Sequence, residues 1–138
     1  MKKIRFLLIS FMISFWSFNV HAADWTMDSG YPKSNFHTQN VMKFIDEVKA
    51  NTSVNINLNP NDTLIKLDAI KTSLQRGQIP IGEIRFGIYG NEDPMYILAG
   101  LPFIAPDYAS AWLLKEVKHE YLQNLFNKKG LKILYTSP

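Results

Sequence analysis

The stretch Val54-Asn55-Ile56-Asn57-Leu58-Asn59 decides the fold class, because apolar and polar residues alternate along it without a break. Alternation with a period of two predicts a β-strand that buries one face and exposes the other. The turn signal Asn59-Pro60-Asn61 follows at once and ends the strand. Patterns typical of helices lie on both sides of this strand, so the chain is predicted to alternate between strands and helices.

The two segments that flank this strand repeat their apolar residues at the spacing of a helix. In the segment 35–51 these residues are Val41, Phe44, Ile45 and Val48, at positions i, i+3, i+4 and i+7. In the segment 62–77 they are Leu64, Leu67, Ile70 and Leu74. Both patterns predict amphipathic helices that bury one stripe. Asp62 or Thr63 can cap the second helix, and Gly77 can end it.

Four further elements complete the predicted order. Strands are expected at 25–28 and, from the alternation of Ile84, Phe86 and Ile88, at 84–88. Asp107 is the predicted cap of the longest helix, which runs to about residue 129 and is stopped by Gly130. Its inward stripe is expected to comprise Leu114, Val117, Tyr121 and Leu125. The segment 131–135 is predicted to form the last strand.

The order β-α-β-α-β-α-β with short connections predicts an α/β protein with a largely parallel sheet and helices on both faces. Open parallel sheets bind ligands at the carboxyl ends of their strands. Three polar loops follow the carboxyl ends of predicted strands: Ser29-Gly30-Tyr31-Pro32 with Asn35, Asn59-Pro60-Asn61-Asp62, and Asn91-Glu92-Asp93. Each of them also reads as an ordinary turn or helix cap, so both interpretations stay open here.

The composition of the 138-residue chain excludes several classes of protein. Cysteine is absent, which excludes disulfides, thiolate metal sites and cysteine nucleophiles. The net charge of +3 comes from Lys2, Lys3 and Arg5, since the rest of the chain holds twelve basic and twelve acidic residues. A balanced chain of this kind gives no support for nucleic-acid binding.

Residues 1–23 have the features of a cleaved signal peptide. A basic start is followed by an apolar run from Phe6 to Phe18 and by the small residues Ala22 and Ala23. The apolar run is shorter than the ~20 residues that a membrane-spanning helix needs. Cleavage is therefore expected after Ala22 or Ala23. The mature domain, residues 24–138, is expected in the periplasm without direct insertion into the membrane.

Motifs for catalysis, metal binding and cofactor binding are missing from the sequence. It contains no nucleophile elbow, no His-Glu-x-x-His motif, no phosphate loop and no Gly-x-Gly-x-x-Gly. His37, close to the first polar loop, is interpreted as a polar contact near a helix start. Arg85 is interpreted as a structural residue of the strand 84–88. We therefore expect no enzyme activity, no cofactor and no metal.

The stretch Ile84-Arg85-Phe86-Gly87-Ile88-Tyr89-Gly90-Asn91-Glu92-Asp93-Pro94 closely resembles a segment of the substrate-binding proteins of tripartite ATP-independent periplasmic (TRAP) transporters, the DctP-like family. In one branch of that family a similar strand leads into a Gly-Asn-Glu-Asp-Pro loop. A Leu-Pro-Phe segment like Leu101-Pro102-Phe103 and a long helix come next, and then a strand similar to Lys129-Gly130-Leu131-Lys132-Ile133-Leu134. The resemblance covers nearly all of the chain that follows the leader.

This resemblance implies the N-terminal part of the first lobe of a bilobal, periplasmic-binding-protein-like (type II) fold. The family's second lobe and its signature arginine, which pairs with the substrate carboxylate, have no counterpart in this chain, so the chain is expected to be truncated. Two loops are expected to face the cleft between the lobes. Carried over residue by residue, the ligand-binding positions are expected to be Tyr31, Asn35, Tyr89, Asn91 and Glu92.

The function implied by the resemblance is that of a periplasmic solute receptor, or a fragment of one. Such a receptor captures a small organic acid, with dicarboxylic and 2-oxo acids as the expected class, and delivers it to the TRAP permease subunits in the membrane. No bond is made or broken. The alternative that stays open is a non-binding exported remnant or an interaction protein.

Overall fold

The computed structural model describes residues 23–137, so the predicted signal peptide lies outside the described residues except for Ala23. Its centre is a parallel sheet in which β1 (Ala23–Asp28) lies between β2 (Val54–Asn59) and β3 (Ile81–Gly82). All six residues of β1 pair with β2, from Ala23 with Val54 to Asp28 with Asn59. The predicted α/β class and the parallel sheet are confirmed, and the carboxyl ends of the strands meet at one edge.

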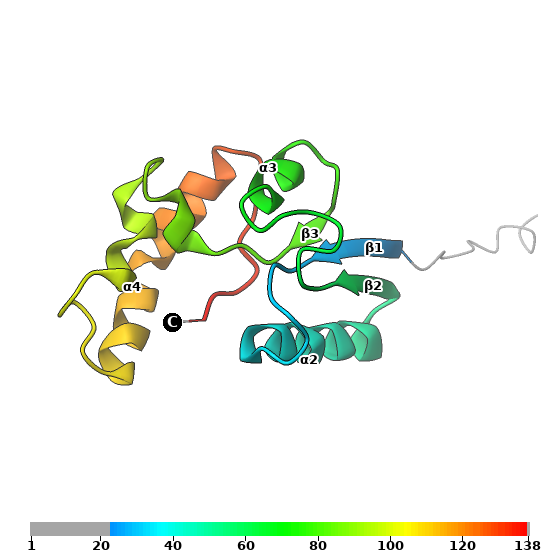
Figure 1. Ribbon diagram of the computed structural model, residues 1–138, viewed down its shortest axis with the longest axis horizontal. Coiled ribbons are helices and arrows are strands. Elements are labelled where there is room, and N and C mark those ends of the chain that lie inside the picture. Colours follow the sequence, from blue (N-terminus) through cyan, green and yellow to red (C-terminus); the bar gives the residue numbers. More distant parts are fainter. Residues whose placement is uncertain (1–22, 138) are drawn as a thin grey trace, which may run out of the picture.

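Helix α2 (Phe36–Asn51) covers one face of this sheet, as Figure 1 shows. Together they form the sheet core, whose buried residues are Met27, Val41, Ile56 and Ile81. Around these pack the partly buried side chains of Phe44, Ile45, Val48, Val54 and Leu58. The predicted helical stripe and the predicted alternation of β2 are both confirmed, because each buries the residues that its period selects.

Helix α3 (Ile70–Gln75) lies on the other side of the sheet in Figure 1 and is shorter than predicted. Asn61 and Asp62 have left-handed backbones, with φ of 64° and 55°, and the Asp62 carboxylate accepts a hydrogen bond from the Leu67 backbone N–H over 2.9 Å. This hydrogen-bonded loop replaces the first half of the predicted helix, so the predicted start at 62 is wrong. The predicted end is confirmed by Gly77, whose φ is +68°.

The predicted strand 84–88 is wrong. The strand β3 ends at Gly82, and the Glu83 backbone N–H still donates to the Asp28 carbonyl over 2.9 Å. Beyond this bond the chain leaves the sheet, and Phe86–Tyr89 form a 3-10 helix. Ile84 and Phe86 turn away from the sheet core because they pack in a second core formed with α4.

Helix α4 (Tyr108–Asn127) carries this second core, called the α4 core below. Its buried residues are Tyr89, Tyr96, Leu122 and Phe126; the short 3-10 helix Pro94–Tyr96 supplies Tyr96, and a second one, Leu98–Gly100, follows it. The predicted cap is confirmed, since the Asp107 carboxylate accepts from the Ser110 N–H over 2.7 Å. The predicted stripe is displaced: Val117 is 71% exposed and Tyr121 is 49% exposed, whereas Lys118 beside them is buried. The rings of Phe86 and Tyr96 hold Phe126 inward, which turns this face of α4 toward the core.

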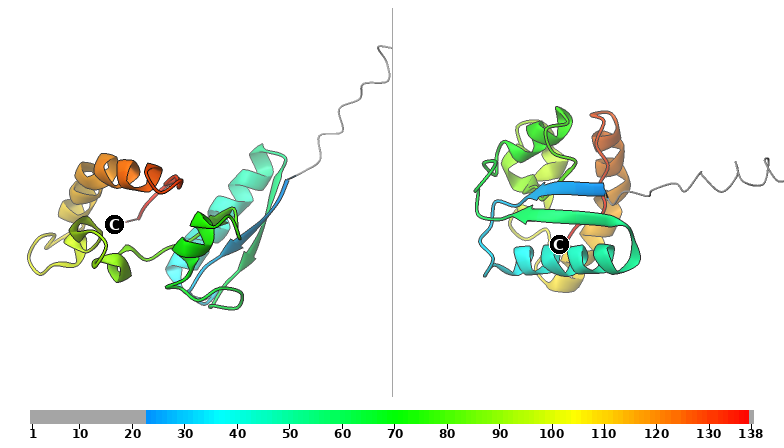
Figure 2. Two further views of the ribbon diagram at one scale, coloured as in Figure 1. Left: turned by 90° about the horizontal axis from the view of Figure 1, so that it is seen from above. Right: turned by 90° about the vertical axis from the view of Figure 1, so that its right-hand side faces the viewer.

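The segment 131–137 follows α4 and is not a strand, so the predicted strand 131–135 is wrong. Leu131 and Ile133 pack against the α4 core. The Tyr135 ring instead meets the Phe44 ring of α2, with 5.4 Å between centroids. Figure 2 shows the segment turning back from the end of α4. The side chains of this segment therefore contact both cores, and the segment does not extend the sheet.

Candidate functional site

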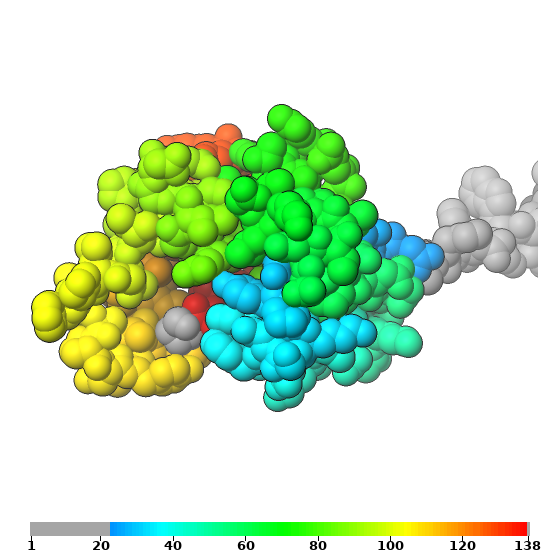
Figure 3. Space-filling view, viewed as in Figure 1, coloured from blue at the N-terminus to red at the C-terminus, as the bar shows by residue number. Residues whose placement is uncertain are grey.

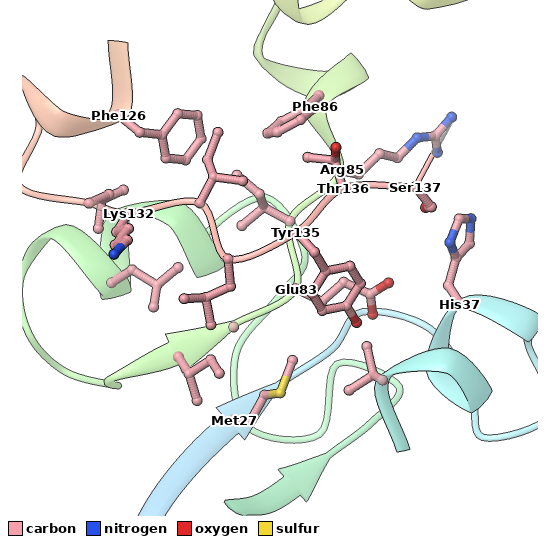
Figure 4. Close-up of a pocket in the computed structure, with 18 of the residues that line it drawn as sticks. Met27, His37, Glu83, Arg85, Phe86, Phe126, Lys132, Tyr135, Thr136 and Ser137 are labelled. Carbon is pink, nitrogen blue, oxygen red and sulfur yellow. The ribbon is translucent and has the colours of Figure 1, made fainter. Parts of the chain in front are cut away.

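A cavity of about 1150 Å³ lies between the sheet core and the α4 core. Figure 4 shows side chains reaching it from β1, α2, the segment after β3, α4 and the C-terminal segment. In Figure 3 the C-terminal residues, drawn in red, lie between α2 and the part that contains α4. Apolar side chains of the wall include Met27, Phe44, Phe86, Tyr96 and Phe126; polar ones include Tyr31, His37, Glu83, Arg85, Thr136 and Ser137. A wall of this mixed kind suits a small organic molecule with a charged group.

A hydrogen-bonded group of side chains lies at the carboxyl end of the sheet. Asp28 of β1 pairs with Gly82 of β3, so the residues that follow them, Ser29 and Glu83, emerge at the same edge. The Ser29 hydroxyl donates to a Glu83 carboxylate oxygen over 2.5 Å and lies 3.4 Å from the hydroxyl of Thr38. Ser29 and Thr38 are fully buried. The Ser29 hydroxyl therefore fixes the Glu83 carboxylate at the cavity wall, while the Thr38 hydroxyl donates to the Tyr31 carbonyl over 3.1 Å.

The first turn of α2 reaches the cavity beside this group. Asn35 caps the helix, because its side-chain oxygen accepts from the His37 backbone N–H over 2.9 Å. The His37 ring stacks on the Tyr31 ring with 5.1 Å between centroids. The first turn carries no acidic residue, so the positive end of the helix dipole is not neutralised by the helix itself. An anion is stabilised near such a helix start.

Glu92 belongs to a different cluster and is not part of the cavity wall. Its carboxylate accepts hydrogen bonds from the ammonium groups of Lys129 and Lys71, and these bonds, that of Lys129 first, hold the pKa of Glu92 below its usual value. Lys71 is 2% exposed, and its Nζ lies 3.8 Å from the centroid of the Tyr89 ring and 5.3 Å from that of Tyr96. This lysine cluster joins α3, the loop at 90–93 and the end of α4 by cation–π and ionic contacts.

The five ligand-binding residues predicted from the sequence lie in two places. Tyr31 lines the cavity, whereas Asn35, four residues later in the chain, is the cap of α2 and is not part of the cavity wall. Tyr89 is buried in the α4 core, and its hydroxyl donates to the Asp68 carbonyl over 3.2 Å. Asn91 is exposed, and Glu92 is held by the lysines. No hydrogen bond or ring contact within residues 23–137 links the first two residues to the other three.

Two cavity residues were missed by sequence reasoning. The predicted strand 84–88 would begin after Glu83, whereas in the structure Glu83 follows β3 directly. The apolar pair Ile79 and Ile81, both buried, was the available signal for a strand three residues earlier. Arg85 was interpreted as a structural strand residue, but it is exposed and lines the cavity.

Asp28 is a further residue that the sequence did not single out. It is fully buried, and neither carboxylate oxygen has a hydrogen-bond partner among the described residues. Burial raises the pKa of this carboxyl; the Ile65 backbone N–H, which is near but does not meet hydrogen-bond geometry, acts against that rise, and nearby Asp62 adds to it. Asp28 follows Met27, which points into the sheet core, so its side chain lies on the opposite face under the loop 61–69.

Residues 23–137 bring no group of three or more His, Cys, Asp and Glu side chains together in a way that could hold a metal ion. In the same part of the chain, no helix combines the length and the apolar character that crossing a membrane requires.

The chain is similar in fold and in sequence to solved solute-binding proteins. DctP6 of Bordetella pertussis, an extracytoplasmic solute receptor binding pyroglutamic acid, is 34% identical with a TM-score of 0.79, over 82% of this chain and 38% of that one. A marine metagenome TRAP solute-binding protein specific for pyroglutamate is 32% identical with a TM-score of 0.81, over 86% of this chain and 40% of that one. The chain therefore spans about two fifths of the length of these proteins.

More distant structures share the fold. A TRAP periplasmic solute-binding protein from Sulfitobacter sp. NAS-14.1 with bound β-D-galacturonate is 17% identical with a TM-score of 0.66, over 77% of this chain and 36% of that one. No protein-family model matches the chain, and no curated protein sequence matches it. The solved structures named here are of solute-binding proteins, and the predicted partial lobe of such a fold is confirmed.

Proposed function

We propose that the chain, which belongs to the TRAP solute-binding proteins and spans about two fifths of their length, takes part in solute capture in the periplasm. Its ligand would be a small organic carboxylate, delivered to the TRAP permease subunits in the membrane. One observation carries the proposal. The carboxyl ends of β1 and β3 and the first turn of α2 place polar groups along one side of the cavity. In open parallel sheets this is where ligands bind.

The proposed site has two parts. Tyr31 and Asn35, at the start of α2, would contact the solute or orient the helix end that faces it. The second proposed part lies outside the cavity wall and comprises Tyr89, at the end of the 3-10 helix Phe86–Tyr89, with Asn91 and Glu92 on the loop after it, which the lysine cluster holds in place. Pyroglutamate, which the solved proteins at 32–34% identity bind, belongs to the carboxylate class proposed here.

Export of the chain gives a first testable prediction. The mature protein is expected to begin at Ala23 or Asp24 and to appear in the osmotic-shock fraction, because the leader has the order of a cleaved signal peptide. Mass spectrometry of the purified protein checks this directly. Intact Met1 in the membrane fraction would contradict the proposed periplasmic location.

Solute binding is tested by NMR titration of the ¹⁵N-labelled full chain. Pyroglutamate, malonate and galacturonate are added up to about 50 mM, because one exposed binding wall is expected to give only millimolar dissociation constants. We expect saturable shifts of the amide signals of residues 29–40, around the start of α2. If no solute shifts them, the proposal falls, and the alternative of a non-binding remnant or interaction protein is favoured.

A further inference from the structure

Lys118 is a buried lysine whose amino group has no partner among the described residues. It lies near the middle of α4 and is 7% exposed. The lysine amino groups that form ion pairs or hydrogen bonds within residues 23–137 are those of Lys71, Lys115 and Lys129. A buried charge without a partner is unfavourable. Burial therefore lowers the pKa of Lys118 and favours its neutral amine.

Lys71 shows how a buried lysine is stabilised as a cation elsewhere in this fold. Lys71 pairs with the Glu92 carboxylate, and its Nζ lies 3.8 Å from the centroid of the Tyr89 ring. Lys118 has neither kind of contact. The remaining lysines of residues 23–137 are at least partly exposed. Within that range Lys118 is the one lysine that is both buried and without a counter-charge.

The acidic side chains around Lys118 are not positioned to hold its proton. Glu116 and Glu120, two residues away on either side, are exposed and lie on the other part of the helix surface, because two residues span more than half a turn. Asp93, beside the 3-10 helix that packs on α4, accepts a hydrogen bond from the Tyr121 hydroxyl over 2.8 Å. The surroundings of Lys118 are therefore apolar rather than acidic.

Lys118 also lines the cavity between the two cores. Leu122, one turn further along α4, is buried in the α4 core. The 3-10 helix Leu98–Gly100 packs against α4 and contributes Gly100 to the cavity wall. A Cβ placed on Gly100 would meet no atom within 4 Å, so space is left on this side of the cavity. A small molecule in the cavity therefore meets a lysine amine in apolar surroundings.

A neutral lysine amine in a desolvated pocket is a nucleophile toward carbonyl groups. An aldehyde suits an amine that is only 7% exposed better than a ketone does, because one side of its carbonyl carbon carries only a hydrogen. We infer that Lys118 captures a small aldehyde in this cavity as a covalent imine. The inference goes beyond the proposed function, since it assigns a covalent site rather than reversible solute binding.

The atoms and electrons of this step balance without an oxidant or a reductant. The lone pair of the Lys118 Nζ forms a bond to the aldehyde carbon, and the π electrons of the carbonyl group move to its oxygen. The two amine protons leave with that oxygen as water. A C=N bond between the lysine and the former aldehyde remains.

The experiment treats the full chain with propionaldehyde and sodium cyanoborohydride, which reduces an imine to a stable secondary amine. Mass spectrometry of the peptides then gives the rate of alkylation at each lysine. Lys118 is expected to react about tenfold faster than Lys71 and Lys132. Lys132, labelled in Figure 4, lines the same cavity but is exposed. Alkylation of exposed lysines that leaves Lys118 intact would overturn the inference.

Two controls connect the reactivity of Lys118 to the fold. In guanidinium chloride the preference for Lys118 should vanish, because it depends on burial; a preference that persists in the unfolded chain would overturn the assignment to this cavity. Lys118→Met keeps an apolar stem and should lose the fast reaction, whereas the matched variant Lys132→Met should change the rate at Lys118 by less than about twofold. If Lys118→Met does not fold, the rates at each lysine of the unmodified chain decide the point.

The outcomes separate this inference from the proposed function. Fast alkylation of Lys118 in a chain that binds none of the carboxylate solutes supports the inference and overturns the proposed function. Binding of a carboxylate solute without preferential alkylation of Lys118 overturns the inference and supports the proposed function.

Discussion

Replacing Glu92 with glutamine is expected to lower the free energy of unfolding by about 3 kcal/mol, because Lys71 is left as a buried charge without its partner. Lys71 is 2% exposed, and its ammonium group pairs with the Glu92 carboxylate. The Tyr89 ring, 3.8 Å away, cannot replace a full counter-charge. Urea unfolding at pH 7 measures the change.

Replacing Lys71 with methionine is the informative control for this prediction. Methionine fills the space between the tyrosine rings without a charge, so Lys71→Met should cost less than about 1 kcal/mol. Combined with Glu92→Gln it should restore most of the lost stability. Glu116→Gln, which breaks the surface pair with Lys115, should change nothing measurable. A double variant no more stable than Glu92→Gln alone would show that the buried charge is not the cause.

The pH dependence of the Lys71–Glu92 ion pair follows from the direction in which the pKa of Glu92 is shifted. Lys129 and Lys71 lower the pKa of the Glu92 carboxyl, so its stabilising contribution is present above the usual carboxyl pKa. The contribution is lost as the pH falls through the lowered value. The difference in stability between the unmodified chain and Glu92→Gln should therefore shrink in acid.

Replacing Asp28 with asparagine is expected to raise the free energy of unfolding at pH 7 by about 1–3 kcal/mol. Both oxygens of the buried Asp28 carboxylate lack a hydrogen-bond partner among the described residues, so the ionised form is unfavourable in the folded state. Asparagine keeps the shape and removes the charge. Urea unfolding across a pH series measures the effect.

The sign of this pH dependence is opposite to that of Glu92. Burial raises the pKa of Asp28, so the stability linked to its protonation is fully present below the unfolded value and is lost as the pH rises through the folded one. The advantage of Asp28→Asn should therefore grow with rising pH and vanish in acid. Asp24→Asn, on the exposed start of the same strand, is the matched control and should show no such trend. A constant advantage at every pH would contradict the assignment to the Asp28 charge.

Four predictions that depended on neighbouring residues in the chain were confirmed, although the helix start predicted at 62 and the inward stripe predicted for α4 were not. The stripe of α2, the alternation of β2, the Asp107 cap and the stop at Gly77 all follow from residues within one or two turns of each other. Such features depend on local hydrogen bonds and on the periodicity of side chains, both of which can be read from a short stretch of sequence. The parallel α/β order followed from them, and the resemblance at 84–94 led to the TRAP solute-binding proteins.

The segments 84–88 and 131–135 show where local pattern is insufficient. Both alternate as strands do, yet Ile84, Phe86, Leu131 and Ile133 pack against the α4 core. Alternation predicts that one face of a segment is buried, but it does not predict which element of the fold covers that face. The aromatic side chains of Tyr96 and Phe126 offered a larger apolar contact than an edge of the sheet beside the two residues of β3.

The sequence by itself determined the class of fold, helix α2, strand β2 and the polar loops from which a site could be built. Only the tertiary structure decided which of these residues meet. His37, Glu83 and Arg85 line one cavity although more than forty residues separate the first from the other two, while Glu92 is held by lysines from positions 71 and 129. The physical reason is that charges and hydrogen bonds act between atoms close in space, and the packing of the two cores brings those atoms together.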